Sequence, residues 1–138
     1  MDENLIDELI QKEKGRVLSF CFALTPSARE AYQLTLDALD FILLEQKAQL
    51  NAISVGNDIK SIPKNFRRIW LLGAYSLAVG RNETFSKTCL RYEKDDLFYG
   101  LSLNERAVLF LFYRLKFSLV DISLMLSFRN LEMITVLN

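Results

Sequence analysis

The sequence contains no histidine, two cysteines, two prolines and five glycines in 138 residues. Without histidine there is no Ser–His or Cys–His pair to activate a nucleophile and no histidine-based zinc site. Cys21 and Cys89 lie far apart without a metal-ligand spacing, and Cys21 stands in an apolar run, which is typical of a small core residue. We therefore expect no catalytic residue, metal site or cofactor, and no enzymatic activity.

The scarcity of glycine and proline leaves few points where helices must stop, and long alternating β-branched runs are missing. Leucine, alanine, glutamate and lysine are plentiful, and apolar residues make up 51% of the chain. These features predict an all-α protein with a sizeable core. The length suits one compact domain or two very small ones.

A net charge is also lacking, because 17 basic residues balance 17 acidic ones. The chain as a whole therefore has no attraction to nucleic acid or to an anionic membrane. Basic residues nevertheless outnumber acidic ones between Ile59 and Lys94 (Lys60, Lys64, Arg67, Arg68, Arg81, Lys87, Arg91 and Lys94 against Glu83 and Glu93). This segment is interpreted either as a solvated basic face or as a nucleic-acid patch.

No membrane segment is expected, because the longest uncharged stretch, 69–80, is too short to span a bilayer. The N-terminal residues are acidic and polar, unlike a signal peptide. We expect a cytoplasmic protein.

Three short amphipathic runs follow one another in the closing stretch, 101–138. Ser102 and Glu105 have the spacing of a capping box at the start of the first run. Ser118 opens the second run, with Asp121 in its first turn, and the third run covers 131–137. Two short helices joined by a tight turn and braced by another helix predict a helix-turn-helix.

Upstream, periodicity predicts a helix over 2–14 with a break at Gly15, and an apolar run over 16–24. Thr25-Pro26 fits an N-cap and a first helical position, before a long helix over about 27–50. Residues 51–64 contain Gly56 and Pro63 and are predicted to be irregular. A second long helix is predicted over about 65–79, followed by a polar linker over 80–100.

The closing stretch also has a set of residues at fixed intervals (Leu101, Glu105, Arg106, Val108, Leu111, Ser118, Ile122, Leu126, Met133 and Leu137). In this spacing it resembles the C-terminal domain of extracytoplasmic-function sigma factors, and LuxR-type DNA-binding domains share much of the pattern. The N-terminal half resembles sigma domain 2 at further positions (Leu24, Thr25, Ala31, Leu34, Leu39, Trp70, Leu71, Ser76 and Arg81). The resemblance implies a domain 2-like half over 1–82, a linker over 83–100 and a helix-turn-helix, domain 4-like half over 101–138.

Charged residues that serve this family in binding are replaced. The family's polymerase-binding motif, Ala-Glu-Asp-Leu-x-Gln, corresponds to Ala31-Tyr32-Gln33-Leu34-Thr35-Leu36 here. The recognition helix has apolar residues in place of groove-reading donors. Five residues remain as candidate DNA contacts (Arg67, Arg68, Arg81, Arg129 and Asn130), and two are candidate protein contacts (Ile134 and Val136).

Three functions follow as hypotheses. The first is a sigma-factor-like transcription regulator that acts mainly through protein contacts, with RNA polymerase, an anti-sigma factor or its own copy, and with reduced or lost DNA readout. The second is an active divergent sigma factor, or another helix-turn-helix transcription factor, that binds promoter DNA. The third is a helical scaffold or assembly subunit unrelated to transcription, because fold resemblance does not fix function.

Overall fold

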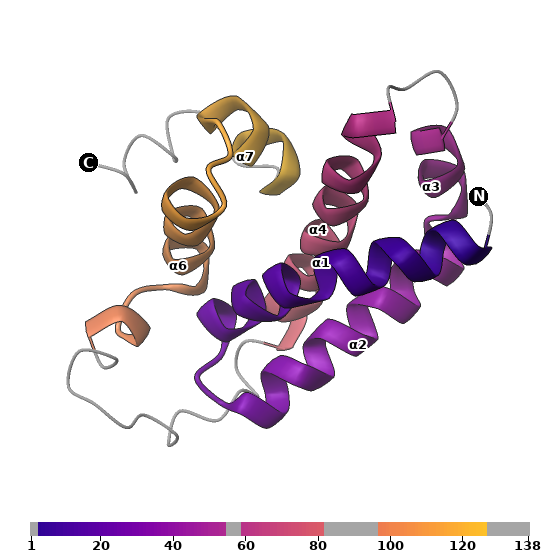
Figure 1. Cartoon of the computed structure of the whole chain (residues 1–138). Coiled ribbons are helices and arrows are strands. Elements are labelled where there is room, and N and C mark those ends of the chain that lie inside the picture. Colours follow the sequence, from indigo (N-terminus) through magenta and orange to yellow (C-terminus); the bar gives the residue numbers. More distant parts are fainter. Residues whose placement is uncertain (1–2, 55–58, 82–96, 127–138) are drawn as a thin grey trace.

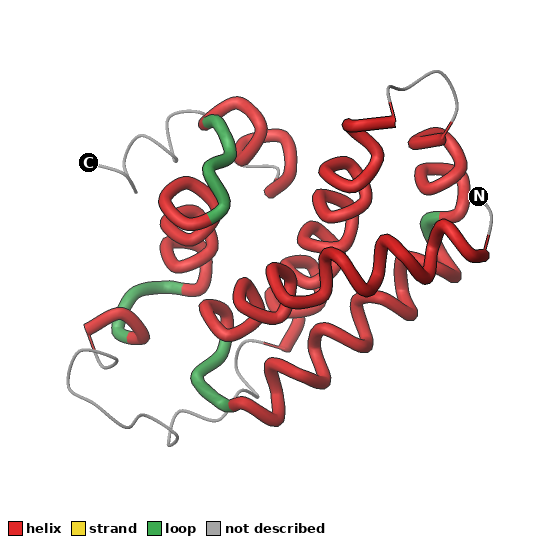
Figure 2. The backbone as a smooth tube through the Cα atoms, in the orientation of Figure 1, coloured by secondary structure: helices red, strands yellow, loops and turns green. Residues whose placement is uncertain are grey.

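The computed structural model describes residues 3–54, 59–81 and 97–126 of the chain. Within these ranges every regular element is helical and no strand occurs, so the predicted all-α class is confirmed (Figure 1 and Figure 2). The elements are α1 (Glu3–Leu24), α2 (Ala28–Glu45), α3 (Lys47–Ser54), the 3₁₀ turn η1 (Ile59–Ser61), α4 (Ile62–Arg81), a helical turn at 97–99, α6 (Leu103–Leu109), the π-helical turn η3 (Phe110–Arg114) and α7 (Leu119–Leu126).

Helix α1 is continuous, so the predicted break at Gly15 is wrong. Gly15 faces open space, and Leu9 and Val17 on either side of it are 2% and 0% exposed. A helical glycine costs about 1 kcal/mol relative to alanine. Burial of each apolar side chain contributes about 1.5–3 kcal/mol. The helix therefore passes through the glycine.

The start of α2 differs by two residues from the prediction that Thr25 is the N-cap and Pro26 the first helical residue. Ser27 is the N-cap, and its hydroxyl accepts a hydrogen bond of 3.4 Å from the Glu30 amide. Thr25 instead donates its hydroxyl to the Glu30 carboxylate at 3.0 Å. The two side chains together fix the sharp turn between α1 and α2.

The predicted long helix over 27–50 is two helices, because α2 ends at Glu45 and α3 begins at Lys47. Gln46 between them has a φ of −117°, which is not helical. The turn allows Leu50 and Ile53 of α3 to be buried, at 3% and 5% exposed. Within the irregular stretch predicted over 51–64, residues 51–54 belong to α3 and residues 62–64 to α4.

Helices α1, α2 and α4 pack together around Leu34, Ala38 and Ile42, all 0% exposed. Cys21, the predicted core cysteine, is also 0% exposed. Trp70 is also buried, and its indole Nε1 donates to the Thr35 carbonyl at 3.1 Å. Gly73 of α4 lies at a close contact with α2. A Cβ added there would lie 3.0 Å from Cγ2 of Ile42 on α2.

The C-terminal half begins with the predicted capping box. Ser102 Oγ accepts from the Glu105 amide at 3.2 Å, and Glu105 Oε1 accepts from the Ser102 amide at 3.1 Å. These bonds hold the pKa of Glu105 below its ordinary value. Ser118 Oγ likewise accepts from the Asp121 amide at 3.1 Å and caps α7. The first two of the three predicted amphipathic runs are therefore helical, and the third run, 131–137, lies outside the described residues. The helix-turn-helix stays a prediction.

The two halves of the chain share one apolar core. Helix α6 and η3 pack on α1, α7 packs on α4, and the buried apolar cluster includes residues of both halves (Figure 1). Phe20 of α1 and Phe110 of η3 contact each other with ring centroids 5.9 Å apart. The predicted division into two domains with a linker stays a prediction, since residues 82–96 are not described.

Candidate functional site: α4 arginines and the groove between α1 and α2

Three candidate DNA-contact residues, Arg67, Arg68 and Arg81, lie on α4, and each forms an ion pair with a carboxylate of another helix. Arg67 binds Glu13 of α1 at 3.0 Å, Arg68 binds Asp121 of α7 at 2.9 Å, and Arg81 binds Asp37 of α2 at 2.7 Å. Arg67 and Arg81 are separated by about 21 Å along the helix axis, at 1.5 Å per residue. The three arginines thus belong to three separate ion pairs between helices.

The pair between Arg67 and Glu13 is the most buried, with side chains 15% and 3% exposed. Arg67 also lies over the ring of Phe117, 5.9 Å from its centroid, so it connects α1 and α4 to the turn before α7. Loss of Arg67 would leave the buried Glu13 carboxylate with only the longer contact, 3.4 Å, to the exposed Arg16, and a poorly compensated buried charge is destabilising. The Arg67 guanidinium therefore serves contacts inside the protein.

The other two pairs are more accessible. Arg68 and Asp121 are 33% and 30% exposed, and Arg81 and Asp37 are 39% and 28% exposed. Burial raises the pKa of Asp37, but hydrogen bonds from Arg81 and Gln33 outweigh this and hold it below its ordinary value. Exposed ion pairs contribute only about 0–1 kcal/mol. Exchange of either carboxylate for a phosphate would therefore cost little.

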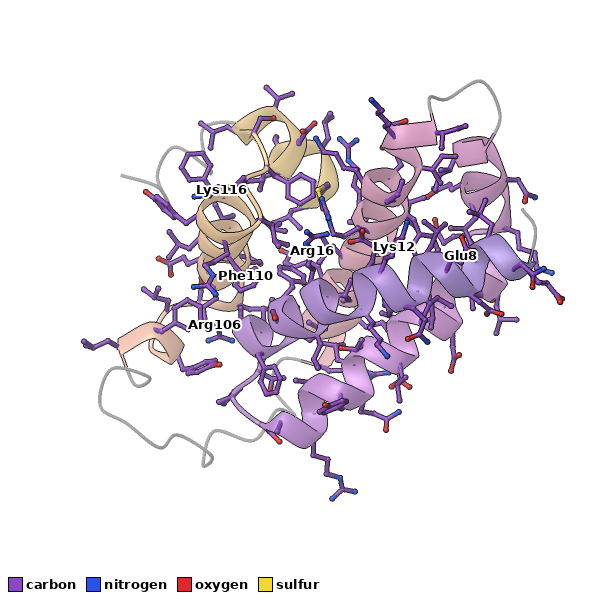
Figure 3. The ribbon with its side chains drawn as sticks, in the orientation of Figure 1. Glu8, Lys12, Arg16, Arg106, Phe110 and Lys116 are labelled. Carbon is purple, nitrogen blue, oxygen red and sulfur yellow. The ribbon has the colours of Figure 1, made fainter. Side chains whose placement is uncertain are left out.

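A fourth arginine, Arg106 of α6, was not predicted as a functional residue. It is 7% exposed and donates to four carbonyls: Nε to Ala23 at 2.8 Å, Nη2 to Leu24 at 2.9 Å, and Nη1 to Leu101 at 2.9 Å and Tyr99 at 3.2 Å. Figure 3 shows Arg106 where α6 approaches the C-terminal end of α1. The guanidinium satisfies carbonyls at the end of α1 and complements the helix dipole there.

A groove of about 290 Å³ lies between α1 and α2. Its walls are mainly apolar (Ile10, Leu18, Tyr32, Leu36 and Leu39), with Trp70 of α4 also lining it. Tyr32 and Leu36 are 58% and 55% exposed, and Lys14 is the titratable cation in the lining. The groove suits apolar side chains of a protein partner more than it suits a reacting substrate.

Chemistry at Cys21 is disfavoured by its surroundings. The thiol is fully buried, and burial raises its pKa to about 12, against a smaller lowering effect of Thr35. It therefore stays protonated at neutral pH, whereas a nucleophile or metal ligand must be a thiolate. Within 3–54, 59–81 and 97–126, no cluster of three potential metal ligands occurs, and no helix has the length and hydrophobicity needed to cross a membrane.

The remaining candidate residues, Arg129, Asn130, Ile134 and Val136, lie outside the described residues, as does Cys89. Comparisons with models of known protein families, with curated proteins and with solved structures find no match to this chain.

Proposed function

We propose that the chain is a sigma-factor-like transcription regulator that acts mainly through protein contacts, and that the groove between α1 and α2 is its contact surface. The observation that carries the proposal is the position of Tyr32 and Leu36. They stand where the resembled family has the glutamate and glutamine of its polymerase-binding motif, and both side chains are more than half exposed beside the groove. A surface that is polar in the family is apolar here.

The energetics favour a protein partner at this surface. Covering the exposed part of each of these two side chains contributes about 1–2 kcal/mol, at roughly 25 cal/mol per Å² of apolar area. Aromatic residues at the centre of an interface often carry much of the binding energy. Polymerase or an anti-sigma factor that presents an apolar ridge would therefore gain affinity from the change.

The ion pairs of the three α4 arginines support reduced DNA readout, which is part of the same proposal. Each is already paired with a carboxylate, so a bound phosphate gains less than it would from an unpaired cation. Promoter binding by Arg68 and Arg81 is the second candidate, and it is favoured by the partial exposure of their pairs. It predicts salt-sensitive binding that weakens when both are replaced by glutamine.

The test is affinity capture of core RNA polymerase and of anti-sigma factors with the purified chain. Leu36→Glu is the test variant, and Leu44→Glu is its matched control, because Leu44 is 71% exposed on the same helix and does not line the groove. We expect Leu36→Glu to weaken capture at least tenfold, about 1.4 kcal/mol, and Leu44→Glu to leave it unchanged. Equal effects of the two variants on capture would reject the groove as the contact surface. Capture of no transcription protein would reject the proposed function.

A further inference from the structure

The groove between α1 and α2 reaches a third helix. Trp70, which lines the groove, belongs to α4 and is 1% exposed, so its indole lies at the bottom of the groove. Gly15 of α1 also lines the groove and adds no side chain to its wall. Within the described part of the chain, no heavy atom lies within 4 Å of a Cβ added at Gly15. The groove is therefore open at this point of α1.

The packing of the protein does not require a glycine at this position. Gly15 lies in the middle of α1 (Glu3–Leu24), where glycine is less favourable than alanine. An isolated glycine inside a helix usually has a packing or a functional reason. Because the space beside Gly15 is empty of protein atoms, the glycine leaves room for a molecule that enters the groove.

Four side chains of the lining carry polar groups, and two of these groups are already hydrogen-bonded within the protein. The Thr35 hydroxyl donates to the Ala31 carbonyl at 2.8 Å, and the Trp70 indole donates to the Thr35 carbonyl at 3.1 Å. The Lys14 ammonium and the Tyr32 hydroxyl remain, and both can donate to an anion. No carboxylate of the described residues pairs with Lys14.

We propose that this groove binds a small molecule that has an apolar body and one carboxylate, such as a medium-chain fatty acid. The body would lie beside Gly15 and above Trp70, and the carboxylate would meet Lys14, because one ammonium matches one negative charge. Small-molecule sites are typically concave and mainly apolar, with a few polar groups that fix the orientation of the ligand.

The volume of the groove sets the size of the ligand. About 290 Å³ holds about ten non-hydrogen atoms, at roughly 30 Å³ each as in liquid water. Octanoate has this size. Its binding does not depend on the proposed function, although an occupied groove would be closed to a protein contact at Tyr32 and Leu36.

Trp70 reports the binding directly, because it is the sole tryptophan and lines the groove. Titration of the full chain with octanoate should change Trp70 fluorescence and reach saturation. Octanamide, which has nearly the same shape without the charge, should bind about three- to fivefold more weakly, as expected for a partly exposed ion pair. Butanoate should bind at least about tenfold more weakly than octanoate, because it buries less apolar surface.

Lys14→Gln tests the contact with the carboxylate. It should reduce the affinity for octanoate to that for octanamide and leave the affinity for octanamide unchanged. Lys12→Gln is the matched control, because Lys12 is also exposed on α1 (Figure 3) but does not line the groove. The two lysines point about 200° apart around the helix. Lys12→Gln should leave the affinity for octanoate unchanged.

Gly15→Leu tests the groove, because its side chain would fill the space that the ligand needs. It should weaken the binding of octanoate and octanamide at least about tenfold. Its urea midpoint should equal or exceed that of the unmodified chain, since leucine favours a helix more than glycine does. A loss of binding would then not result from unfolding.

Three results would each overturn the proposal. They are a Trp70 signal that does not saturate with octanoate, equal affinities of the unmodified chain for octanoate and octanamide, and undiminished octanoate binding by Gly15→Leu. Equal losses of octanoate affinity in Lys12→Gln and Lys14→Gln would also overturn it, because they would indicate a general attraction of the surface for anions. The comparison of octanoate with octanamide needs no variant.

Discussion

Replacement of Arg106 by methionine removes a cation that lies at the junction of the two halves of the chain. Arg106 is 7% exposed, and its guanidinium donates to the carbonyls of Ala23 and Leu24 in α1 and of Tyr99 and Leu101 before α6. It also stacks on Tyr99, 5.3 Å from the ring centroid. Methionine keeps much of the side-chain length and fills part of the space, so the main loss is hydrogen bonding.

The expected cost is about 3–4 kcal/mol of unfolding free energy. Hydrogen bonds to a charged group contribute roughly 1.5–3 kcal/mol each, but such bonds are not additive within one network. The carbonyls of Leu101 and Tyr99 regain water more easily than those at the buried end of α1, which lowers the total. For 138 residues, an unfolding entropy of about 2.1 cal/mol/K per residue converts this cost to a fall of roughly 10–14 °C in Tm.

Urea denaturation followed by Trp70 fluorescence measures this cost, because Trp70 is the sole tryptophan and is 1% exposed. Arg114→Met is the matched control, since Arg114 is exposed on η3, and it should change stability by less than about 0.5 kcal/mol. Arg106→Lys should lose about 1–2 kcal/mol, because an ammonium cannot reproduce the fork of the guanidinium. If Arg106→Met lowers the unfolding free energy no more than Arg114→Met does, the hydrogen bonds of Arg106 do not stabilise the junction of the two halves.

Further predictions concern the buried ion pair, two glycines and the buried thiol. Arg67→Met should cost about 2–3 kcal/mol in urea denaturation, because the buried Glu13 keeps only its longer contact to the exposed Arg16. Glu13→Leu in the same chain should restore most of this stability, and no restoration would contradict the pairing. Gly15→Ala should raise stability by about 0.5–1 kcal/mol, since its Cβ meets open space. Gly73→Ala should instead lower it by about 1 kcal/mol or more, because its Cβ would be 3.0 Å from a fully buried Ile42; equal effects of the two alanines would contradict the close helix contact. Cys21 has a pKa raised to about 12 from 9.0. The folded chain therefore keeps a proton that the unfolded chain releases, and the unfolding free energy should fall by up to about 1.4 kcal/mol per pH unit above pH 9. Cys21→Ala should remove this component from urea denaturation series between pH 8 and pH 11, and an unchanged slope would count against the burial.

Local signals in the sequence predicted elements well where one short-range interaction decides the structure. The capping box of Ser102 and Glu105, and the Ser118 cap of α7, are confirmed because each needs only residues within one helical turn. The second amphipathic run, which Ser118 was predicted to open, likewise forms α7 with one buried stripe. These features depend little on the rest of the chain.

Helix boundaries set by tertiary packing were predicted poorly. Gly15 does not break α1 and Gln46 does end α2, although propensity indicates the opposite for both residues. The turn at Gln46 follows from the burial of Leu50 and Ile53 in the common core. Propensity differences below about 1 kcal/mol cannot decide such positions against burial of whole side chains.

The candidate site shows the same limit for charged residues. Arg67 stood out in the sequence as a cation, whereas its partner Glu13 lies 54 positions earlier, in the helix predicted over 2–14. A signal for Glu13 was present. It falls in the i, i+4 series with Leu9 and Val17, and both neighbours in that series are buried. A carboxylate inside an apolar stripe indicates a buried cation partner, but the sequence alone does not say which arginine provides it.

The ion pairs of α4 also determine how a DNA-binding function would have to operate. Arg68 and Arg81 would each exchange an internal carboxylate for a phosphate, so the net gain in charge pairing per contact is small. Release of Asp121 would in addition loosen α7 from α4, because this ion pair joins the two helices. DNA binding through Arg68 should therefore be accompanied by weaker packing of α7. A protein contact at Tyr32 and Leu36 has no such cost, because neither side chain lies in an ion pair and both are already exposed.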